Sequence, residues 1–329
     1  MKLTLKNQTI KEYLKKFPNT PKLTLARKIY SENKQLYKNV EDVRGKINYI
    51  TGTNGNHARK MFDRSFLNEL NKLKKDLPKG ETDKIPDYHL PKSIRKVLMI
   101  SDIHIPYHDD EALFAALETG LKEGVDCVWL NGDTIDFYGL SRFEHDPRKR
   151  SVKYELDCTR AFLKGLRAMF PKALILYKVA NHEIRYEKFL MHKAPELLDM
   201  EEFELSVLLR FNELGIHEIK DKQLAHIGEL KVLHYHELPL KSGGVNPARA
   251  VFLKTGASTI GGHYHRKSEH VERTLEGKLI KVYSTGCLCD LSPAYMPFNN
   301  WSHGFAIIDV NKNGTYTVNN KTIIDGKVY

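Results

Sequence analysis

The sequence predicts an α/β fold with parallel strands, preceded by a basic helical region. Residues 97–100 form a short apolar run typical of a buried strand, and residues 125–130 form a second one. A helical pattern at residues 111–122 connects the two runs. Because a strand–helix–strand connection is nearly always a right-handed crossover, the two strands should be parallel and end at the same edge of a sheet.

The N-terminal residues 1–78 have the pattern of short helices. Pro21, after an N-cap candidate, begins an expected helix over residues 21–30, and a second helix is expected over residues 40–50. The second helix carries apolar residues at spacings of four and three, namely Val43, Ile47 and Ile50. Two short helices with basic residues on the second are typical of a helix-turn-helix and equally of any small helical bundle. Both interpretations remain open.

Positive charge is concentrated in the first third of the chain. Residues 1–96 hold 23 Lys and Arg against 10 Asp and Glu, a net charge of +13, whereas residues 97–329 hold 29 against 31, a net charge of −2. This distribution indicates either a module that faces a polyanion such as nucleic acid or an ordinary surface of solvated, lysine-rich helices.

A linker is predicted between this region and a catalytic domain. Residues 79–91 contain Gly80, Pro86 and Pro91, so we expect the catalytic domain to cover residues 92–329. Residues 185–224 have a helical pattern with little strand character, which predicts an insertion near the entrance of the site. Further strands are expected at residues 173–179, 229–233, from residue 258, and then in a second sheet at residues 279–283, 305–310 and 315–318.

Polar side chains of the kind that bind metals follow five of the expected strands. They are Asp102 and His104, then Asp133, then Asn181 and His182, then His234, and finally His263 and His265. A single histidine at a strand end is more often an ordinary packed or surface residue than a ligand. Chance does not place such residues at every strand end, so the pattern predicts a metal or phosphate site.

The motifs that contain these residues resemble the calcineurin-like metallophosphoesterase superfamily in order and spacing. They are DxH at residues 102–104, GDxxD at 132–136, NHE at 181–183, a strand-end His234, and GHxH at 262–265. The match covers about residues 96–310, and the basic helical region lies outside it. The resemblance implies a four-layer α/β/β/α sandwich with two mixed sheets and the site between them. The arrangement also resembles the DNA-repair-exonuclease branch and the stand-alone versions found in bacteriophages.

The resemblance also implies a ligand set and a mechanism. One divalent metal ion would be held by Asp102, His104 and His265, the other by Asn181, His234 and His263, with Asp133 bridging both. Hydroxide generated from water between the two ions would attack phosphorus in line with the leaving oxygen. Nitrogen and oxygen ligands suit Mn²⁺, Fe or Zn²⁺, and family habit favours Mn²⁺. His182 would donate a proton to the leaving group or stabilise the equatorial charge, with Asp136 as its orienting partner.

Two positions depart from the family pattern. Ala180 stands where the family usually has glycine before Asn-His-Glu, which a backbone with negative φ would tolerate. Tyr235 stands where glycine often follows the fourth-strand histidine. His236 is therefore an alternative ligand, although His234 is favoured because it comes first after the strand.

The substrate class is open between several phosphoesters. A monoester phosphatase tends to clamp its dianionic phosphate with arginine, whereas a nuclease needs a positive track along the polymer. Arginines near the motif ends, Arg142, Arg148, Arg150, Arg185 and Arg266, fit either. The basic N-terminal region favours a nuclease. The alternatives are a phosphatase or phosphodiesterase on small nucleotides or phosphoproteins, and a regulatory protein that binds nucleic acid.

The loop at residues 284–304 carries three aromatic residues, Tyr295, Phe298 and Trp301. Aromatic side chains beside a metal site can stack on a nucleobase, and they can equally pack together as a lid. Both interpretations remain open.

Composition points to the cytoplasm. No apolar run approaches the roughly 18 residues of a membrane span, and the N-terminus lacks the apolar core of a secretory signal. Four cysteines are too few for a disulfide framework in 329 residues, so we interpret them as reduced structural thiols.

Overall fold

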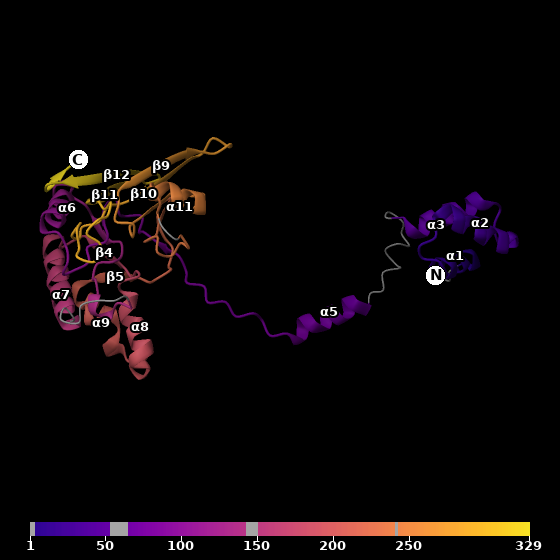
Figure 1. The fold of residues 1–329 in the computed structure, drawn as a ribbon, viewed down its shortest axis with the longest axis horizontal. Coiled ribbons are helices and arrows are strands. Elements are labelled where there is room, and N and C mark those ends of the chain that lie inside the picture. Colours follow the sequence, from indigo (N-terminus) through magenta and orange to yellow (C-terminus); the bar gives the residue numbers. More distant parts are fainter. Residues whose placement is uncertain (1–3, 53–64, 143–150, 241–242) are drawn as a thin grey trace. The chain divides into compact units, whose positions relative to one another are not determined.

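The computed structural model of the chain describes residues 4–52, 65–142, 151–240 and 243–329. The chain divides into two compact units, residues 1–83 and 84–329 (Figure 1). Arg148 and Arg150, two of the arginines near the motif ends, lie outside the described residues. Among the described helices, none is both long and apolar enough to cross a membrane.

The first unit contains a small helical bundle. The helices of this unit are α1 (Leu5–Lys16), α2 (Lys22–Glu32), the 3₁₀ turn η1 (Lys34–Leu36), α3 (Val40–Thr51) and, outside the bundle core, α5 (Ser65–Asp76). The Asn39 side chain caps α3 by accepting a hydrogen bond from the Asp42 N–H. The core is formed by α1, α2, α3 and the turn before α3: Ile10, Leu25, Ala26, Ile29, Tyr37, Val43, Ile47 and Ile50. The structure thus confirms the two predicted helices and adds α1 as a third member of the bundle.

The second unit contains two mixed β-sheets. The seven-stranded sheet has the order β13 (Lys327–Val328), β12 (Tyr316–Ile324), β11 (Gly304–Val310), β2 (Lys96–Ile100), β3 (Cys127–Leu130), β4 (Leu174–Lys178), β5 (Ile216–Ile219). Strands β2 to β5 are parallel, as predicted for β2 and β3, and β11 to β13 are antiparallel. The six-stranded sheet has the order β1 (Tyr88–His89), β6 (Ala225–Ile227), β7 (Leu230–Val232), β8 (Thr259–Gly261), β10 (Leu279–Ser284), β9 (Ser268–Arg273).

Helices cover the outer faces of the two sheets. Helices α6 (Asp110–Glu123) and α7 (Val152–Met169) pack on the seven-stranded sheet, and α11 (Pro247–Thr255) packs on the six-stranded sheet (Figure 1). The remaining short helices are η2 (Tyr138–Leu140), α8 (Ile184–Lys193), η4 (Pro195–Leu197), η5 (Glu201–Phe203), α9 (Leu205–Leu208) and α10 (Phe211–Leu214). The four layers are those of the predicted α/β/β/α sandwich.

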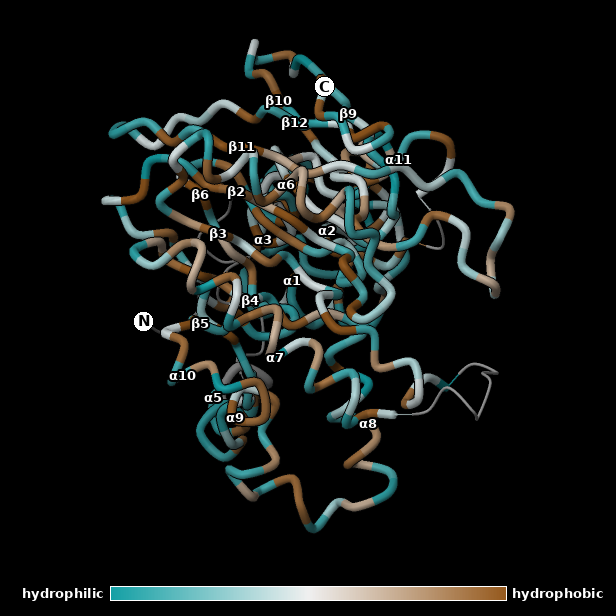
Figure 2. The backbone as a smooth tube through the Cα atoms, turned by 90° about the vertical axis from the view of Figure 1, so that its left-hand side faces the viewer, coloured by the Kyte–Doolittle hydropathy of each residue, from teal (hydrophilic) through white to brown (hydrophobic). Residues whose placement is uncertain are grey.

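Strand β2 shows why the sheets stack in this way. Leu98 and Ile100 belong to the core beneath α6 and α7, whereas Val97 and Met99 belong to the core between the two sheets. Successive side chains of a strand point to opposite faces, so a strand buried on both sides must be apolar throughout. Figure 2 shows β2 accordingly as a hydrophobic stretch inside the unit.

Three segments differ from the sequence-based expectations. Residues 216–219, within the predicted helical insertion, form β5 and pair in parallel with β4. Their two apolar side chains, Ile216 and Ile219, are buried, but four residues are too few to show a strand period among short helical turns. Tyr88–His89, inside the predicted linker, form β1 and pair with β6. Strand β9 is polar and largely exposed, so it has no apolar pattern to recognise.

Candidate metal centre

The predicted ligands lie in the loops that follow β2, β3, β4, β7 and β8: Asp102, His104, Asp133, Asn181, His234, His263 and His265. Backbone hydrogen bonds hold neighbouring loops together, since the Asp102 N–H donates to the Gly132 carbonyl at 3.1 Å. The two sheets are joined at the same place, because the His263 N–H donates to both Asp102 carboxylate oxygens at 2.9 and 3.1 Å. Residues distant in the sequence therefore form one cluster.

The backbone of this cluster is strained. Five of the predicted ligands have left-handed φ angles: Asp102 (55°), His104 (54°), Asp133 (51°), His263 (75°) and His265 (54°). A residue other than glycine in this region costs about 1–3 kcal/mol, and such residues gather at functional sites. The chain bends sharply after each strand, which brings the side chains close to one another.

The first group of side chains consists of Asp102, His104 and His265. The Nε2 atoms of His104 and His265 are 3.1 Å apart, and His265 Nε2 is 3.2 Å from Asp102 Oδ1. His104 Nδ1 lies 2.8 Å from Asp136 Oδ1, so this nitrogen carries the proton and Nε2 presents its lone pair to the group. Lone pairs and an anionic oxygen that converge in this way suit a cation.

The second group consists of Asp133, Asn181, His234 and His263. His234 Nε2 is 3.1 Å from Asp133 Oδ2, and ligand atoms of Asp133, His234 and His263 lie within 4.8 Å of one another. Asn181 Oδ1 is buried and has no hydrogen-bond partner among the described residues. An unpaired buried polar group costs about 1–3 kcal/mol, a cost that coordination to a cation would remove. Asp133 also groups with His104, so its carboxylate is close to both groups.

The electrostatics of the cluster favour an added positive charge. Burial alone would raise the pKa of Asp133, but the charges of His182 and His234 hold it well below its usual value. Burial would lower the pKa of His234, yet the Asp133 and Asp102 carboxylates raise it to about 10. Burial and the charge of His234 lower the pKa of His263 to about 4, which leaves that ring neutral. A divalent cation would replace the proton of His234 and neutralise the same carboxylates.

The outward-facing ring nitrogens of the histidines are held by neighbours, as is usual for metal ligands. His234 Nδ1 lies 2.6 Å from the Asn131 carbonyl. His265 Nδ1 lies 3.9 Å from the Sγ of Cys289. The sequence predicts Cys289 only as a structural thiol, and no metal-binding spacing around it indicates this position beside the first group.

Two buried glutamates brace the loops that carry the ligands. The Glu183 carboxylate accepts hydrogen bonds from the backbone N–H groups of Asp133 and Thr134 at 3.1 and 2.8 Å. The Glu237 carboxylate accepts one from the His234 N–H at 3.0 Å. Glu183 can be identified from the sequence because it belongs to the Asn-His-Glu motif. Nothing in the sequence around Glu237 indicates its role.

His182 lies at the edge of the cluster and is oriented by Asp136. His182 Nδ1 is 3.0 Å from Asp136 Oδ1, and Arg185 Nη2 is 3.0 Å from His182 Nε2. Burial would lower the pKa of His182, but the Asp133 and Asp136 carboxylates raise it above its usual value. These carboxylates favour the protonated ring, while the Arg185 guanidinium, which can only donate hydrogen bonds, faces Nε2 and opposes it.

The two departures from the family pattern are accommodated. Ala180 is not among the residues with positive φ, and the Cβ that Gly132 lacks would lie 2.5 Å from the Ala180 methyl. Glycine at position 132 thus leaves room for alanine at 180. Tyr235 does adopt a left-handed φ of 73°, but its side chain is fully buried and its hydroxyl donates to the Tyr283 carbonyl at 2.7 Å. Packing and this hydrogen bond offset the backbone cost.

The geometry favours His234 over His236 as the fourth-strand ligand. His236 Nε2 lies 2.8 Å from Asp221 Oδ1, in an ion pair outside the cluster. Replacing His234 by alanine is therefore expected to remove one bound metal ion per chain, whereas the matched His236→Ala variant should keep both. Metal content after dialysis, measured by elemental analysis, checks this. Equal loss of metal in the two variants would reverse the assignment.

A buried carboxyl group beneath the site gives a pH-dependence. Burial, assisted by the Asp136 charge, raises the pKa of Glu155 to about 7 from 4.5. The stability that its neutral form contributes is present below pH 4.5 and is lost as the pH rises through 7. Each pKa unit corresponds to about 1.4 kcal/mol. The contribution of Glu155 to the free energy of unfolding should therefore fall by up to about 3 kcal/mol between pH 4.5 and pH 7.

Glu155→Gln removes this titration. The free energy of unfolding of the variant, minus that of the wild type, should increase by about 2–3 kcal/mol between pH 4.5 and pH 8. Urea denaturation at both pH values measures the difference, with the exposed Glu276→Gln as control. A difference between variant and wild type that does not change with pH would contradict the expectation.

Two facing mixed sheets, helices on both outer faces and an Asp- and His-rich cluster at the strand ends define the fold class. It is the calcineurin-like metallophosphoesterase fold that the motifs resemble. The donor atoms suit divalent cations, because carboxylate and imidazole groups converge and the buried Oδ1 of Asn181 lacks a hydrogen-bond partner among the described residues.

Comparison with known proteins gives remote likenesses. No protein-family model matches the chain, and no curated protein does. Vacuolar Protein Sorting 29 from Cryptosporidium parvum is 15% identical over 72% of this chain and 95% of that one, with a TM-score of 0.39. The phosphoesterase YfcE from E. coli is 14% identical over 65% and 88%, with a TM-score of 0.32. A dimetal phosphatase from Danio rerio is 12% identical over 66% and 92%, with a TM-score of 0.30. At these values, the chemistry of this chain has to be inferred from its own residues.

Proposed function

We propose that the protein is a metal-dependent phosphodiesterase that cleaves nucleic acid. The observation that carries this proposal is the double cluster of ligand atoms. Asp133 lies close to both groups, and Asn181 Oδ1 is buried without a hydrogen-bond partner among the described residues. Asp102, His104 and His265 would hold one cation, Asn181, His234 and His263 the other, and Asp133 both.

The proposed cations supply the activation of water and substrate. When bound, two divalent cations polarise phosphoryl oxygens and lower the pKa of water, so no covalent enzyme intermediate is needed. We propose Mn²⁺ as the cation, since imidazole and carboxylate ligands suit it. The tight packing of the loops, with Asp102 and Asp133 almost fully buried, keeps the ligands in place before substrate arrives.

His182 and Asp136 perform the proton transfer in this proposal. His182 gives its proton to the oxygen that leaves phosphorus, and the Asp133 and Asp136 carboxylates support this role by raising the pKa of its ring. Asp136 Oδ1 lies 3.0 Å from His182 Nδ1 and so orients the His182 ring. The same oxygen lies 2.8 Å from His104 Nδ1. Arg185, which donates to the Asp136 carbonyl at 2.9 Å, adds positive charge where the phosphate would lie.

Charge supports nucleic acid as the substrate. Residues 1–96 carry a net charge of +13, whereas residues 97–329, which hold the candidate metal centre, carry a net charge of −2. Exposed basic residues of the helical unit include Lys15, Lys22 and Arg27. A polyanion with regularly spaced phosphates would be attracted to such a surface over a wide area.

The proposal is tested with the full chain, with and without Mn²⁺. The substrates are a chromogenic phosphodiester, the matching monoester, and single- and double-stranded DNA. We expect metal-dependent cleavage of the diester and of DNA, with the monoester cleaved more slowly. A preference for the monoester, with DNA left intact, would overturn the proposal in favour of a phosphatase.

The basic unit is tested by substitution. The triple variant K15E/K22E/R27E changes exposed residues only, so we expect an unchanged rate on the chromogenic diester and a KM for DNA raised about 10-fold or more. Unaltered DNA cleavage in this variant would remove the basic unit from substrate binding.

A further inference from the structure

Two cavities flank the metal centre, and their linings differ in chemistry. One, of 410 Å³, includes His104 and Asp136 and is otherwise lined largely by aromatic and small side chains. The other, of 820 Å³, includes Asn181 and His263, and four Lys and Arg side chains are among those that line it. Each cavity therefore borders a different group of proposed ligands, with Asp133 close to both groups.

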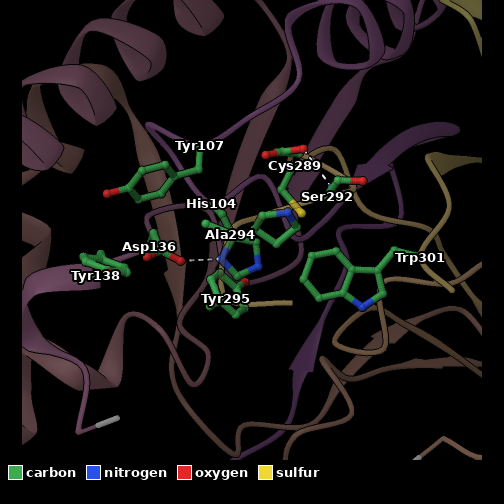
Figure 3. A pocket seen from close by; sticks show the side chains of 11 residues that line it. His104, Tyr107, Asp136, Tyr138, Cys289, Ser292, Ala294, Tyr295 and Trp301 are labelled. Carbon is green, nitrogen blue, oxygen red and sulfur yellow. Dashed lines mark hydrogen bonds and ion pairs between the residues drawn. The ribbon is translucent and has the colours of Figure 1, made fainter. Parts of the chain in front are cut away.

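The first cavity has aromatic walls. Tyr107 and Tyr138 form one wall, with ring centroids 5.9 Å apart, and Tyr295 and Trp301 form another, with centroids 6.4 Å apart. Figure 3 shows the two tyrosines on one side of His104 and Trp301 on the other. Trp301 also contacts the ring of His265 at 4.2 Å between centroids, so this wall adjoins the first group of ligands. The volume is in the range of small-molecule sites, about 300–1,000 Å³.

Two of the three aromatic rings on this loop are largely exposed. Tyr295 is 64% exposed and Phe298, on the same loop, is 97% exposed. Rings that packed as a lid would be buried, because each would remove a large apolar area from water. Exposed rings beside a polar reaction centre are instead suited to stacking on a planar group that arrives with the substrate.

The second cavity has a basic wall provided largely by α8. Arg185, Lys188 and His192 are spaced three and four apart, so they lie on one face of this helix. Lys193 also lines the cavity, and no Asp or Glu is among the described residues that do so. Lys188 and Lys193 are exposed, and neither forms an ion pair within the described part of the chain. Since residues 97–329 carry a net charge of −2, this wall is a local concentration of positive charge.

We propose that these cavities are two subsites for one single-stranded polynucleotide. The aromatic cavity takes an unpaired base next to the scissile phosphate, and the basic cavity takes the following phosphates. This inference rests on the proposed phosphodiesterase function and adds the strandedness and path of the substrate. A base can enter the aromatic cavity only after leaving its stack, which is least costly in a strand without a partner.

The basic cavity is tested with K188Q/K193Q, and K164Q/K172Q, which changes exposed lysines outside both cavities, is the control. For a short oligothymidylate we expect the KM of K188Q/K193Q to rise about 10-fold. The slope of log KM against log salt concentration should be smaller than that of the wild type by about 1.4, because two lysine–phosphate contacts are lost and each contributes about 0.7 on a single strand. The control should match the wild type in both measurements.

The aromatic cavity is tested with Tyr295→Ala and its rescue variant Tyr295→Phe. Loss of one stacking partner, worth about 1–3 kcal/mol, should raise the KM for the oligothymidylate about 10-fold in the alanine variant, and phenylalanine should restore it. Binding without turnover gives a second measurement. Of the two tryptophans, Trp129 is fully buried, so the oligothymidylate should quench the fluorescence of Trp301 in metal-free protein. Trp301→Phe should abolish this quenching.

The outcomes separate the inference from the function on which it rests. No metal-dependent turnover of the chromogenic diester by the wild type refutes the phosphodiesterase. Normal diester turnover with unchanged KM values in K188Q/K193Q or in Tyr295→Ala refutes the two subsites, as does an effect at only one cavity. Faster cleavage of the oligothymidylate when it is paired with oligodeoxyadenylate would also overturn the inference. Slower cleavage of the duplex, with the KM for the oligothymidylate raised in both variants and unchanged in K164Q/K172Q, supports it.

Discussion

Replacing Asp133 by asparagine should reduce turnover of the chromogenic diester by about a thousandfold. The substitution would keep the size of the side chain but remove the negative charge that lies 3.1 Å from His234 and near both ligand groups. Each factor of ten in rate corresponds to about 1.4 kcal/mol of activation free energy, so a thousandfold loss corresponds to about 4 kcal/mol. Loss of the charge shared by two cations is of that size, because each cation contributes several kcal/mol of charge stabilisation.

Asp309→Asn is the matched control for this variant. Asp309 is on β11 of the same sheet, but its side chain is 43% exposed, forms an ion pair with Lys96 and accepts a hydrogen bond from Asn319 at 3.5 Å. Steady-state rates at saturating Mn²⁺, together with bound metal per chain, measure both variants. Turnover by Asp133→Asn within tenfold of the wild type would show that Asp133 does not bridge the cations.

Replacing His182 by glutamine should lower kcat by about 100- to 1,000-fold while both metal ions stay bound. The ring lies 3.0 Å from Asp136 and 3.8 Å from Asp133, so its proton is held close to the place of reaction. General acid catalysis by a positioned group usually contributes a factor of about 10² to 10⁴. Glutamine can donate a hydrogen bond but cannot release a proton to the leaving oxygen.

Leaving-group dependence distinguishes this role from a structural one. The variant should lose most rate on DNA, whose leaving alkoxide needs a proton, and least on a nitrophenyl diester, whose leaving group is stable as an anion. His270→Gln on β9, at the edge of the six-stranded sheet, is the control. An equal loss on both substrates, or a loss of bound metal, would contradict the assignment.

Most of the fold follows from sequence patterns because the central strands are buried on both faces. Residues 97–100 and 127–130 are apolar without interruption, so their strand character and parallel order are evident. Strands β1, β5 and β9 could not be predicted in this way. They are at or near sheet edges and short or polar, and their positions depend on partners distant in the sequence.

The candidate site was predictable to the extent that each ligand follows a strand. Parallel strands bring their carboxyl ends together, which is why Asp102 and Asp133 could be expected to meet. The choice between His234 and His236 could be made only from the structure. The loop after β7 places the His234 ring inside the cluster, where it is buried, and the His236 ring beside Asp221. The contacts of Cys289 with His265 and of Glu237 with His234 likewise could not be predicted, because no sequence motif around either residue indicates them.

The most direct test of the account is the position of bound metal. Crystals grown with Mn²⁺ and measured at the manganese absorption edge should show two anomalous peaks, roughly 3.5–4 Å apart as in other two-metal sites. One should lie among Asp102, His104 and His265, and the other among Asn181, His234 and His263, with Asp133 touching both. A cluster without an anomalous peak, with its acids and imidazoles turned apart, would contradict the account.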